Sequence, residues 1–299
     1  MIFITWLVQC LLILLTVAFF TLFERKVIGL FHLRVGPNKV SFIGLLQPLL
    51  DAFKLLTKQN LTPFRANKFI YNLAPIIALI LSLFVWITIP NIYLILSINY
   101  SIVLFFCISS IIVFSVLIAG WSSNSKYSLI GSLRSVAQSI SYESVFSTIL
   151  VIILVLISSY SIRSFITESS LLFLIFFPLW VICTLAETHR APFDFSESES
   201  ELVSGFNTEY SGAYFAFIFL SEYAILIYSC LLITYIFIIW LIPLNFIIVT
   251  VITLLISFLF IWIRVTYCRF RYDMLIIISW KILLPFSLLL FISILIIII

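Results

Sequence analysis

Charged residues are scarce in this 299-residue chain. Only 9% of its residues are Asp, Glu, Lys or Arg, whereas a soluble domain carries roughly 25%. In their place 64% of the residues are hydrophobic, and the mean hydropathy is +1.30. No soluble core of this size could bury that much apolar surface, so we expect the chain to lie in a membrane.

Sequence motifs for cofactors are also missing. The seven glycines form neither the G-x-G-x-x-G pattern of dinucleotide-binding folds nor a phosphate-binding P-loop. The five cysteines show no C-x-x-C spacing, and the two histidines, His32 and His189, have no partners at metal-ligand spacing. We therefore expect no catalytic residue, cofactor motif or metal site in this chain, so any redox chemistry must come from other chains.

Eight apolar runs are long enough to cross a bilayer as helices, which takes about 20 residues each. Their approximate ranges are 2–23, 69–89, 100–119, 135–158, 171–187, 214–240, 245–264 and 278–299. The first run is followed, not preceded, by charged residues, which is the reverse of a cleavable signal peptide. Because no repeat or flexible linker interrupts the pattern, we expect residues 1–299 to form a single all-α polytopic membrane domain.

The basic residues are distributed unevenly across these predicted spans. Eight spans place both termini on one face of the membrane. Fifteen of the 16 Lys and Arg residues then fall in or beside loops of the opposite face, and only Arg163 lies on the side of the termini. By the positive-inside rule, the basic face is expected to be cytoplasmic or, in an organelle, to face the matrix.

Residues 42–58, between the first two predicted spans, have the pattern of an amphipathic helix. Polar residues recur there at steps of four, three and four and form one narrow stripe: Gln47, Asp51, Lys54 and Lys58. Apolar residues cover the remaining surface, so we predict a helix in the membrane interface or against the bundle, with Pro48 as a point where it would kink. The alternative is a helix that only shields the bundle.

Three carboxylates lie in or at the end of predicted spans: Glu143, Glu187 and Glu222. The apolar stretch after Glu143 covers only residues 145–157, about 20 Å of helix, so its helix must begin upstream near Arg134 and draw Glu143 into the membrane. A carboxylate at that depth needs a partner, water or a raised pKa, which makes these acids candidates for proton relay. The structural alternative is that they only satisfy neighbouring polar groups.

A run of acids follows the fifth predicted span. Glu197, Glu199 and Glu201 stand at alternate positions shortly after Asp194. Like charges this close repel one another and favour protonation of some members. The run is equally compatible with proton transfer and with docking to a basic partner.

Several segments, in order over most of the chain, carry a family resemblance. They are Glu24–Gly29 (ERKVIG), Leu33–Asn38 (LRVGPN), Gly44–Pro48 (GLLQP), Gly120–Asn124 (GWSSN), Ala137–Glu143 (AQSISYE), Ala186–Asp194 (AETHRAPFD), Glu199–Asn207 (ESELVSGFN), Trp262–Arg264 (WIR) and Arg269–Asp273 (RFRYD). Together they closely resemble subunit 1 of mitochondrial NADH:ubiquinone oxidoreductase, respiratory complex I. A set of this length and order is far more specific than any one short motif.

This resemblance implies a core membrane subunit of a proton-pumping NADH:ubiquinone reductase, a translocase of the mitochondrial inner membrane whose basic loops face the matrix. Such a subunit carries no redox cofactor. Ubiquinone is the substrate, whereas NADH, FMN and iron-sulfur clusters belong to partner subunits. The implied partners are the quinone-site and terminal-cluster subunits of the peripheral arm, adjacent small membrane subunits and lipids, with no nucleic acid.

The resemblance also assigns roles to two sets of residues by position. The quinone passage takes Glu24, Arg25, Arg34, Arg269 and Arg271. The proton path takes Asp51, Glu143, Glu187, Glu197, Glu199, Glu201 and Glu222. The chain departs from the common pattern at Gln59, where many members have an acid, at His189, where Asn is common, and at Cys268, where Pro is common.

Three other functions remain compatible with buried acids in a membrane protein. The chain could be the membrane subunit of an energy-converting hydrogenase, a stand-alone proton-coupled transporter or a purely structural anchor. Transporters often show inverted repeats and helices broken by Gly or Pro, and neither feature is evident in this sequence. An anchor would tolerate neutralisation of the buried acids.

Overall fold

The computed structural model of this chain describes residues 2–90, 98–162, 164, 174–194, 205–238 and 246–298, and across these residues it contains helices and no β-strand. The α-helices are α1 (Ile2–Phe31), α2 (Gln47–Thr57), α3 (Lys68–Val85), α4 (Ser101–Ser122), α5 (Lys126–Ile157), α7 (Phe177–Glu187), α9 (Gly212–Ile233), α10 (Phe246–Thr266), α11 (Tyr272–Ile277) and α12 (Leu284–Ile298). Short 3₁₀ segments are η1 (Phe42–Gly44), η2 (Trp86–Thr88) and η4 (Gly205–Asn207). Two π-helical segments, η5 (Thr234–Ile238) and η7 (Ile278–Leu283), continue α9 and join α11 to α12.

Seven helical segments of the described residues are long and apolar enough to cross a membrane: Thr5–Phe31, Lys68–Thr88, Ser101–Ser122, Lys126–Ile157, Gly212–Ile238, Ile247–Thr266 and Tyr272–Ile296. An eighth apolar helix, α7, is shorter, and the predicted span 171–187 that contains it begins outside the described residues. The prediction of an all-α integral membrane protein is confirmed.

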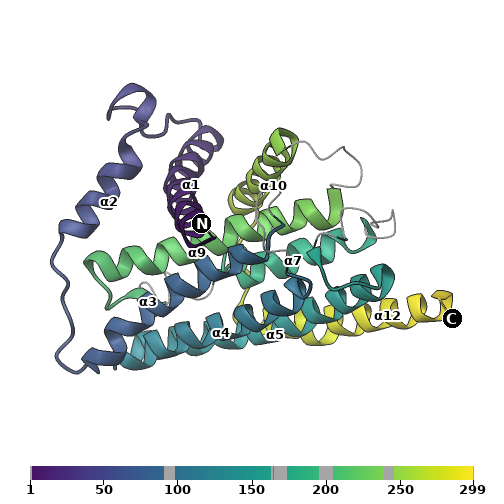
Figure 1. Ribbon diagram of the computed structural model, residues 1–299. Helices are drawn as coiled ribbons and strands as arrows, with labels where there is room; N and C mark the ends of the chain where they lie inside the picture. The colour runs from purple at the N-terminus through teal and green to yellow at the C-terminus, as the bar shows by residue number, and fades with distance from the viewer. Residues whose placement is uncertain are drawn as a thin grey trace.

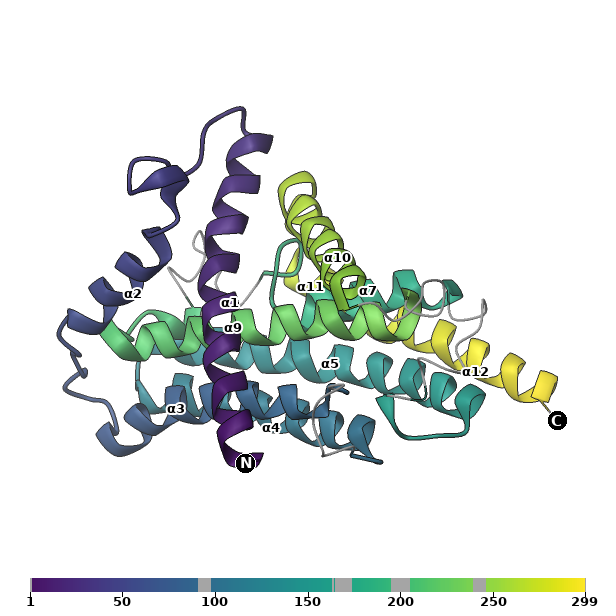
Figure 2. The ribbon, with the colours of Figure 1, turned by 45° about the horizontal axis from the view of Figure 1, so that its top comes forward.

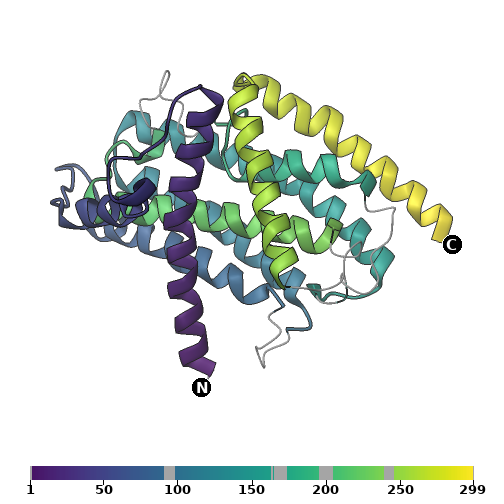
Figure 3. The same cartoon turned by 90° about the horizontal axis from the view of Figure 1, so that it is seen from above.

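The spanning helices lie in two directions. Helices α3, α4, α5 and α9 run alongside one another in Figures 1 and 2, with α3 against both α4 and α9 and with α4 against α5. Helix α1 crosses α9 steeply in Figure 2, and α10 lies beside α1, which Figure 3 shows from above. This crossing brings the C-terminal half of α1 to α9 and α10, where Glu24 becomes buried.

Two helices extend beyond their apolar runs. Helix α1 continues to Phe31 rather than ending near residue 23, so the charged residues Glu24 and Arg25 are part of the helix. Helix α5 begins at Lys126, which carries Glu143 well inside a 32-residue helix, as the length argument required. Hydropathy alone underestimates both helices because their polar turns are buried or paired in the folded protein.

The amphipathic helix is shorter than the range 42–58. Helix α2 begins at Gln47, because Ile43 and Gly44 take up left-handed backbone conformations with φ of 59° and 75°. Pro48 therefore lies in the first turn, where it needs no hydrogen-bond partner, and starts the helix instead of kinking it. Leucines 49, 50 and 56 and Phe53 are exposed on α2, while Asp51 turns toward α1.

A close contact between two glycines sets how α5 packs against η4. A Cβ added to Gly131 would lie 2.8 Å from the Cα of Gly205, which is a backbone atom and cannot move aside as the end of a flexible side chain can. Gly131→Ala is therefore expected to destabilise the protein by about 1–3 kcal/mol, which is the typical penalty of overpacking. The check is the thermal unfolding midpoint of the purified protein, with Ser144→Ala on the same helix as the control. An unchanged midpoint for Gly131→Ala would show that this contact is loose.

Candidate functional site

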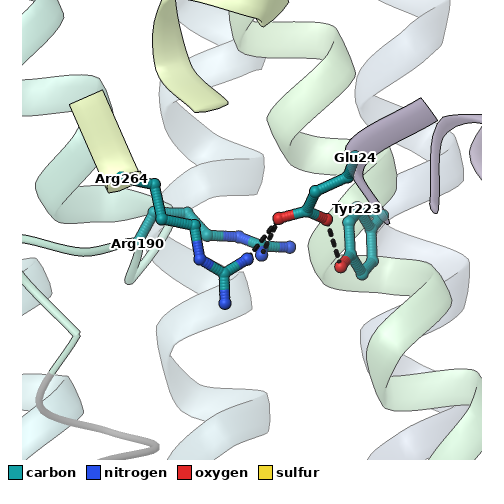
Figure 4. Close-up of polar contacts among 4 residues, drawn as sticks. All are labelled: Glu24, Arg190, Tyr223 and Arg264. Carbon is teal, nitrogen blue, oxygen red and sulfur yellow. Dashed lines mark hydrogen bonds and ion pairs between the residues drawn. The ribbon is translucent and has the colours of Figure 1, made fainter. Parts of the chain in front are cut away.

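Glu24 of α1 is only 5% exposed. It lies in a buried cluster of charged and polar side chains (Figure 4). Nη1 of Arg190 donates a hydrogen bond to its Oε1 at 3.1 Å, and Nη1 of Arg264 donates to the same oxygen. The hydroxyl of Tyr223 donates to Oε2 at 2.6 Å. Glu24 belongs to α1, Tyr223 to α9 and Arg264 to α10. Arg190 lies in the loop that follows α7, so the cluster joins elements that are distant in the sequence.

Arg190 is the central cation of this Glu24 cluster. Its guanidinium lies 4.3 Å from the centre of the Tyr223 ring, in cation–π contact. Burial alone would lower the pKa of Arg190, yet the charge of Glu24, the Tyr223 hydroxyl and the charge of Glu222 together raise it above its ordinary value. Arg190 therefore stays charged and interacts electrostatically both with the Glu24 cluster and with Glu222.

The loop that carries Arg190 is held in place by Gln138 of α5. The Gln138 side-chain amide donates to the carbonyl oxygens of Ala186 at 2.9 Å and Phe193 at 2.8 Å, one at each end of the loop. The carbonyl of Pro192 also accepts a hydrogen bond from the backbone N–H of Phe270. These bonds fix residues 186–193 between α5 and the segment that follows α10.

A cavity of about 100 Å³ lies next to the same loop. Three acids line it, each from a different helix: Glu143 of α5, Glu187 of α7 and Glu222 of α9. His189 and several hydroxyl side chains, among them Ser135, Ser139 and Ser221, also line this acid cavity. One water molecule needs a cavity volume of roughly 10–15 Å³. The acid cavity can therefore hold several water molecules, and its polar lining offers them hydrogen-bond partners.

His189 lies in the loop between the acid cavity and the Glu24 cluster. Its backbone N–H bonds to the carbonyl of Ala186, and its φ of 50° is a left-handed conformation. Burial lowers the pKa of His189 from its ordinary 6.5 to about 4, so the imidazole is neutral near pH 7. Its ring Nδ1 is buried and has no hydrogen-bond partner within the described part of the chain.

The remaining predicted site residues lie nearer the surface. Asp51 pairs with Arg25 at 2.7 Å and accepts a hydrogen bond from Gln47 at 2.9 Å, so it joins α2 to α1 and does not line the acid cavity. Arg269 pairs with Asp194 at 3.3 Å, and Arg271 pairs with Asp273 at 3.2 Å. Arg34 is exposed. Glu197, Glu199 and Glu201 lie outside the described residues.

The sequence interpretation missed the partners of Glu24. In the sequence Arg190 and Arg264 are two of the fifteen basic residues in or beside the loops of one face, and Tyr223 lies in the apolar run 214–240. The available signal was the position of Glu24 at the end of an apolar run, because a buried carboxylate requires cations near it.

Across the described residues no group of three or more His, Cys, Asp or Glu side chains could hold a metal ion.

Comparison with known proteins gives consistent matches over nearly the whole chain. The profile of a family described as NADH dehydrogenase matches residues 4–295. A protein of Aedes aegypti named NADH-ubiquinone oxidoreductase chain 1 is 48% identical over 284 residues, covering 92% of this chain and 89% of the relative. Proteins with the same name are similar in Anopheles gambiae, at 46% over 92% of this chain and 89% of the relative, and in Lampetra fluviatilis, at 45% over 95% of this chain and 92% of the relative.

Proposed function

This chain belongs to the NADH dehydrogenase family, and on that premise we propose that it forms the quinone entrance of NADH:ubiquinone oxidoreductase and links quinone reduction to proton transfer through its buried acids. It is a multi-pass membrane subunit of complex I and assembles with other complex I subunits in the mitochondrial inner membrane. Its basic loops face the matrix, where the peripheral arm docks.

The quinone enters beside α1 and α2. The exposed apolar residues of α2 suit an isoprenoid tail, whereas Arg25 and Arg34 at the nearby surface suit a polar or anionic headgroup. The electron donor is an iron-sulfur cluster in a neighbouring subunit. This chain contributes the walls and charges of the passage, not a redox centre.

One observation carries the coupling proposal. Glu187 and Arg190 lie three residues apart, yet Glu187 lines the acid cavity while Arg190 bonds Glu24 in the buried cluster. Arg190 also interacts electrostatically with Glu222 of the cavity. A change of charge near Glu24 strengthens or weakens the attraction that holds the Arg190 guanidinium there. A shift of this guanidinium changes the electric field at Glu222 and so how readily that acid holds its proton.

The proton path begins at the acid cavity. Glu143, Glu187 and Glu222 exchange protons through water there when quinone reduction perturbs the charges around Glu24. A proton that enters or leaves one carboxyl changes the proton affinity of the other two, because like charges in one cavity disfavour each other. The acidic run Glu197, Glu199 and Glu201 would continue this path, and Asp51 would act near the quinone passage.

Photo-crosslinking of the assembled complex tests the quinone passage. A photoreactive ubiquinone analogue is expected to label peptides that contain residues 25–57, and excess unlabelled ubiquinone is expected to suppress the labelling. Labelling elsewhere, or labelling that ubiquinone does not suppress, would contradict this assignment. If the chain were a hydrogenase subunit or a structural anchor, excess ubiquinone would not suppress the labelling. If it were a stand-alone transporter, it would not comigrate with an NADH-oxidising assembly on a native gel.

A further inference from the structure

The segment that follows α2 exchanges hydrogen bonds with the N-terminal end of α9. The side-chain Oδ1 of Asn60 accepts a hydrogen bond from the backbone N–H of Ala213 at 2.9 Å. In return the Oγ of Ser211 accepts one from the backbone N–H of Leu61 at 3.0 Å. We call this pair of bonds the α2–α9 link. It joins segments that lie 150 residues apart in the sequence.

The α2–α9 link supplies the cap of α9. The first N–H groups of a helix have no partner inside the helix, and the side chain of the N-cap residue usually accepts a bond from one of them. Ser211 is the N-cap of α9, yet its side chain makes no cap bond. Asn60 accepts instead from Ala213, the second residue of the helix, and Asn is one of the best acceptors for this purpose. The first turn of α9 is therefore completed by the segment after α2.

Gly212, the first residue of α9, lets the two segments come this close. Its φ of 61° is a left-handed conformation that residues with a side chain rarely adopt. A Cβ on this residue would collide with Oδ1 of Asn60 and would lie 2.9 Å from the carbonyl oxygen of Lys58. The glycine thus fits the close contact that the α2–α9 link requires.

The other contacts that position α2 are weak. Asp51 of α2 pairs with Arg25 of α1, but this ion pair is exposed, and exposed pairs contribute little. The Nζ of Lys26 donates a hydrogen bond to the carbonyl oxygen of Ile43, which is also exposed. Within α2, which the structure describes completely, only Pro48 is buried. The position of α2 therefore depends strongly on the α2–α9 link.

Helix α2 extends from α1 to the start of α9, as Figures 1 and 2 show. Its Asp51 is bonded to α1, and the segment after it is bonded to α9, so the three helices form the sides of a triangle in Figure 2. The quinone entrance proposed above lies beside α1 and α2. The α2–α9 link is the corner that fixes α2 relative to the other two helices.

We propose that Asn60 is a positioning residue of the quinone passage: through the α2–α9 link it holds α2 at the spacing from α1 that admits ubiquinone. The inference rests on the proposed function and names what fixes its entrance. When the link opens, α2 leaves its place and the entrance binds quinone less well. The apparent affinity for quinone then falls in proportion to the share of molecules that keep α2 in place.

The test is Asn60→Ala in the assembled complex, since Ala lacks the acceptor oxygen. The KM for ubiquinone should rise about threefold, the size of change that the loss of one helix cap allows when the remaining contacts are weak. The kcat at saturating ubiquinone should stay at the wild-type value, because the buried acids and the electron donor are unchanged. A wild-type KM, or a fall of kcat without a change of KM, would overturn the proposal.

Two further substitutions separate positioning from a general structural role. Asn60→Asp keeps an acceptor oxygen of the same reach, and a carboxylate suits the positive end of a helix, so its KM should match the wild type. Asn67→Ala is the matched control: Asn67 lies on the same connection and is the N-cap of α3, but its side chain makes no cap bond. Its KM should also be unchanged. A KM raised equally in all three variants would contradict a role of the α2–α9 link.

Amide hydrogen exchange shows whether the link itself responds. Peptides that contain the N–H groups of Leu61 and Ala213 should exchange faster in Asn60→Ala than in Asn67→Ala, and equal rates would contradict the proposal. If Asn60→Ala does not assemble, the wild-type complex is measured with and without bound ubiquinone. An occupied passage stabilises α2 in place, so ubiquinone should slow exchange at both groups, and an unchanged rate would count against the link.

Photo-crosslinking distinguishes the failure of this inference from the failure of the proposed function. If the photoreactive ubiquinone does not label residues 25–57 of the wild type, the proposed passage is wrong, and the inference falls with it. If the wild type is labelled there and Asn60→Ala is labelled equally at low quinone concentration, only the role of Asn60 is contradicted. Weaker labelling of Asn60→Ala that recovers at high quinone concentration supports both.

Discussion

Glu24→Leu is expected to prevent normal accumulation of the protein, because it removes the anion that two arginines share in a buried site. Arg190 would remain charged, with a side chain only 14% exposed, and would lose the carboxylate with which it forms its ion pair. Breaking a buried ion pair by removing one partner costs about 3–5 kcal/mol, a large share of the roughly 5–15 kcal/mol that stabilises a typical protein. The measurements are the steady-state amount of assembled complex and its thermal unfolding midpoint.

The matched control is Asp51→Asn in the surface pair that joins α2 to α1. Arg25 and Asp51 are 54% and 35% exposed, and exposed pairs contribute only about 0–1 kcal/mol. This variant should accumulate almost as well as the wild type. Equal levels of the Glu24→Leu and Asp51→Asn complexes would contradict the structural importance of the Glu24 cluster.

Glu187→Gln is expected to cause the largest functional loss. Glutamine is nearly the same size and keeps the hydrogen-bonding capacity of the cavity, but it cannot release a proton. Coupled ubiquinone turnover should fall on the order of a hundredfold, the contribution of a typical general acid or base. Glu143→Gln should act in the same direction, while NADH oxidation by an artificial acceptor should continue in both variants.

Glu209→Gln is the control for this pair of substitutions. Glu209 is a carboxylate just before α9, and it does not line the acid cavity; its backbone carbonyl accepts a hydrogen bond from Tyr71. Its neutralisation should leave coupled turnover near the wild-type level. A loss as large as that of Glu187→Gln would mean that the acid cavity has no special part in coupling.

The membrane architecture could be predicted because it depends on local hydropathy. The length of each apolar run can be read directly from the sequence. The stretch 145–157 is too short to cross a bilayer, so its helix had to begin upstream, and α5 begins at Lys126. The acids Glu143, Glu187 and Glu222 could be singled out in the same way, since a carboxylate within an apolar run is costly wherever the helix packs. That they line one cavity depends on how α5, α7 and α9 pack, which hydropathy does not report.

The Glu24 cluster depends on contacts that no local pattern contains. Arg190 lies 166 residues from Glu24 and Arg264 lies 240 residues away, so only the crossing of α1 with α9 and α10 brings them together. The predicted start of α2 at residue 42 was wrong for a different reason. Ile43 and Gly44 have left-handed backbone conformations, and the spacing of hydrophobic residues does not indicate backbone conformation. Tertiary contacts and backbone conformation thus decided the features that the sequence pattern missed.

The number of protons pumped per NADH oxidised tests the central claim most directly. It is measured in proteoliposomes that contain the complex with Glu187→Gln, with Glu209→Gln as the control, under conditions where both variants still reduce ubiquinone. If the acid cavity couples quinone reduction to proton transfer, the ratio falls in Glu187→Gln and stays at the wild-type value in Glu209→Gln. A wild-type ratio and rate in Glu187→Gln would contradict the account.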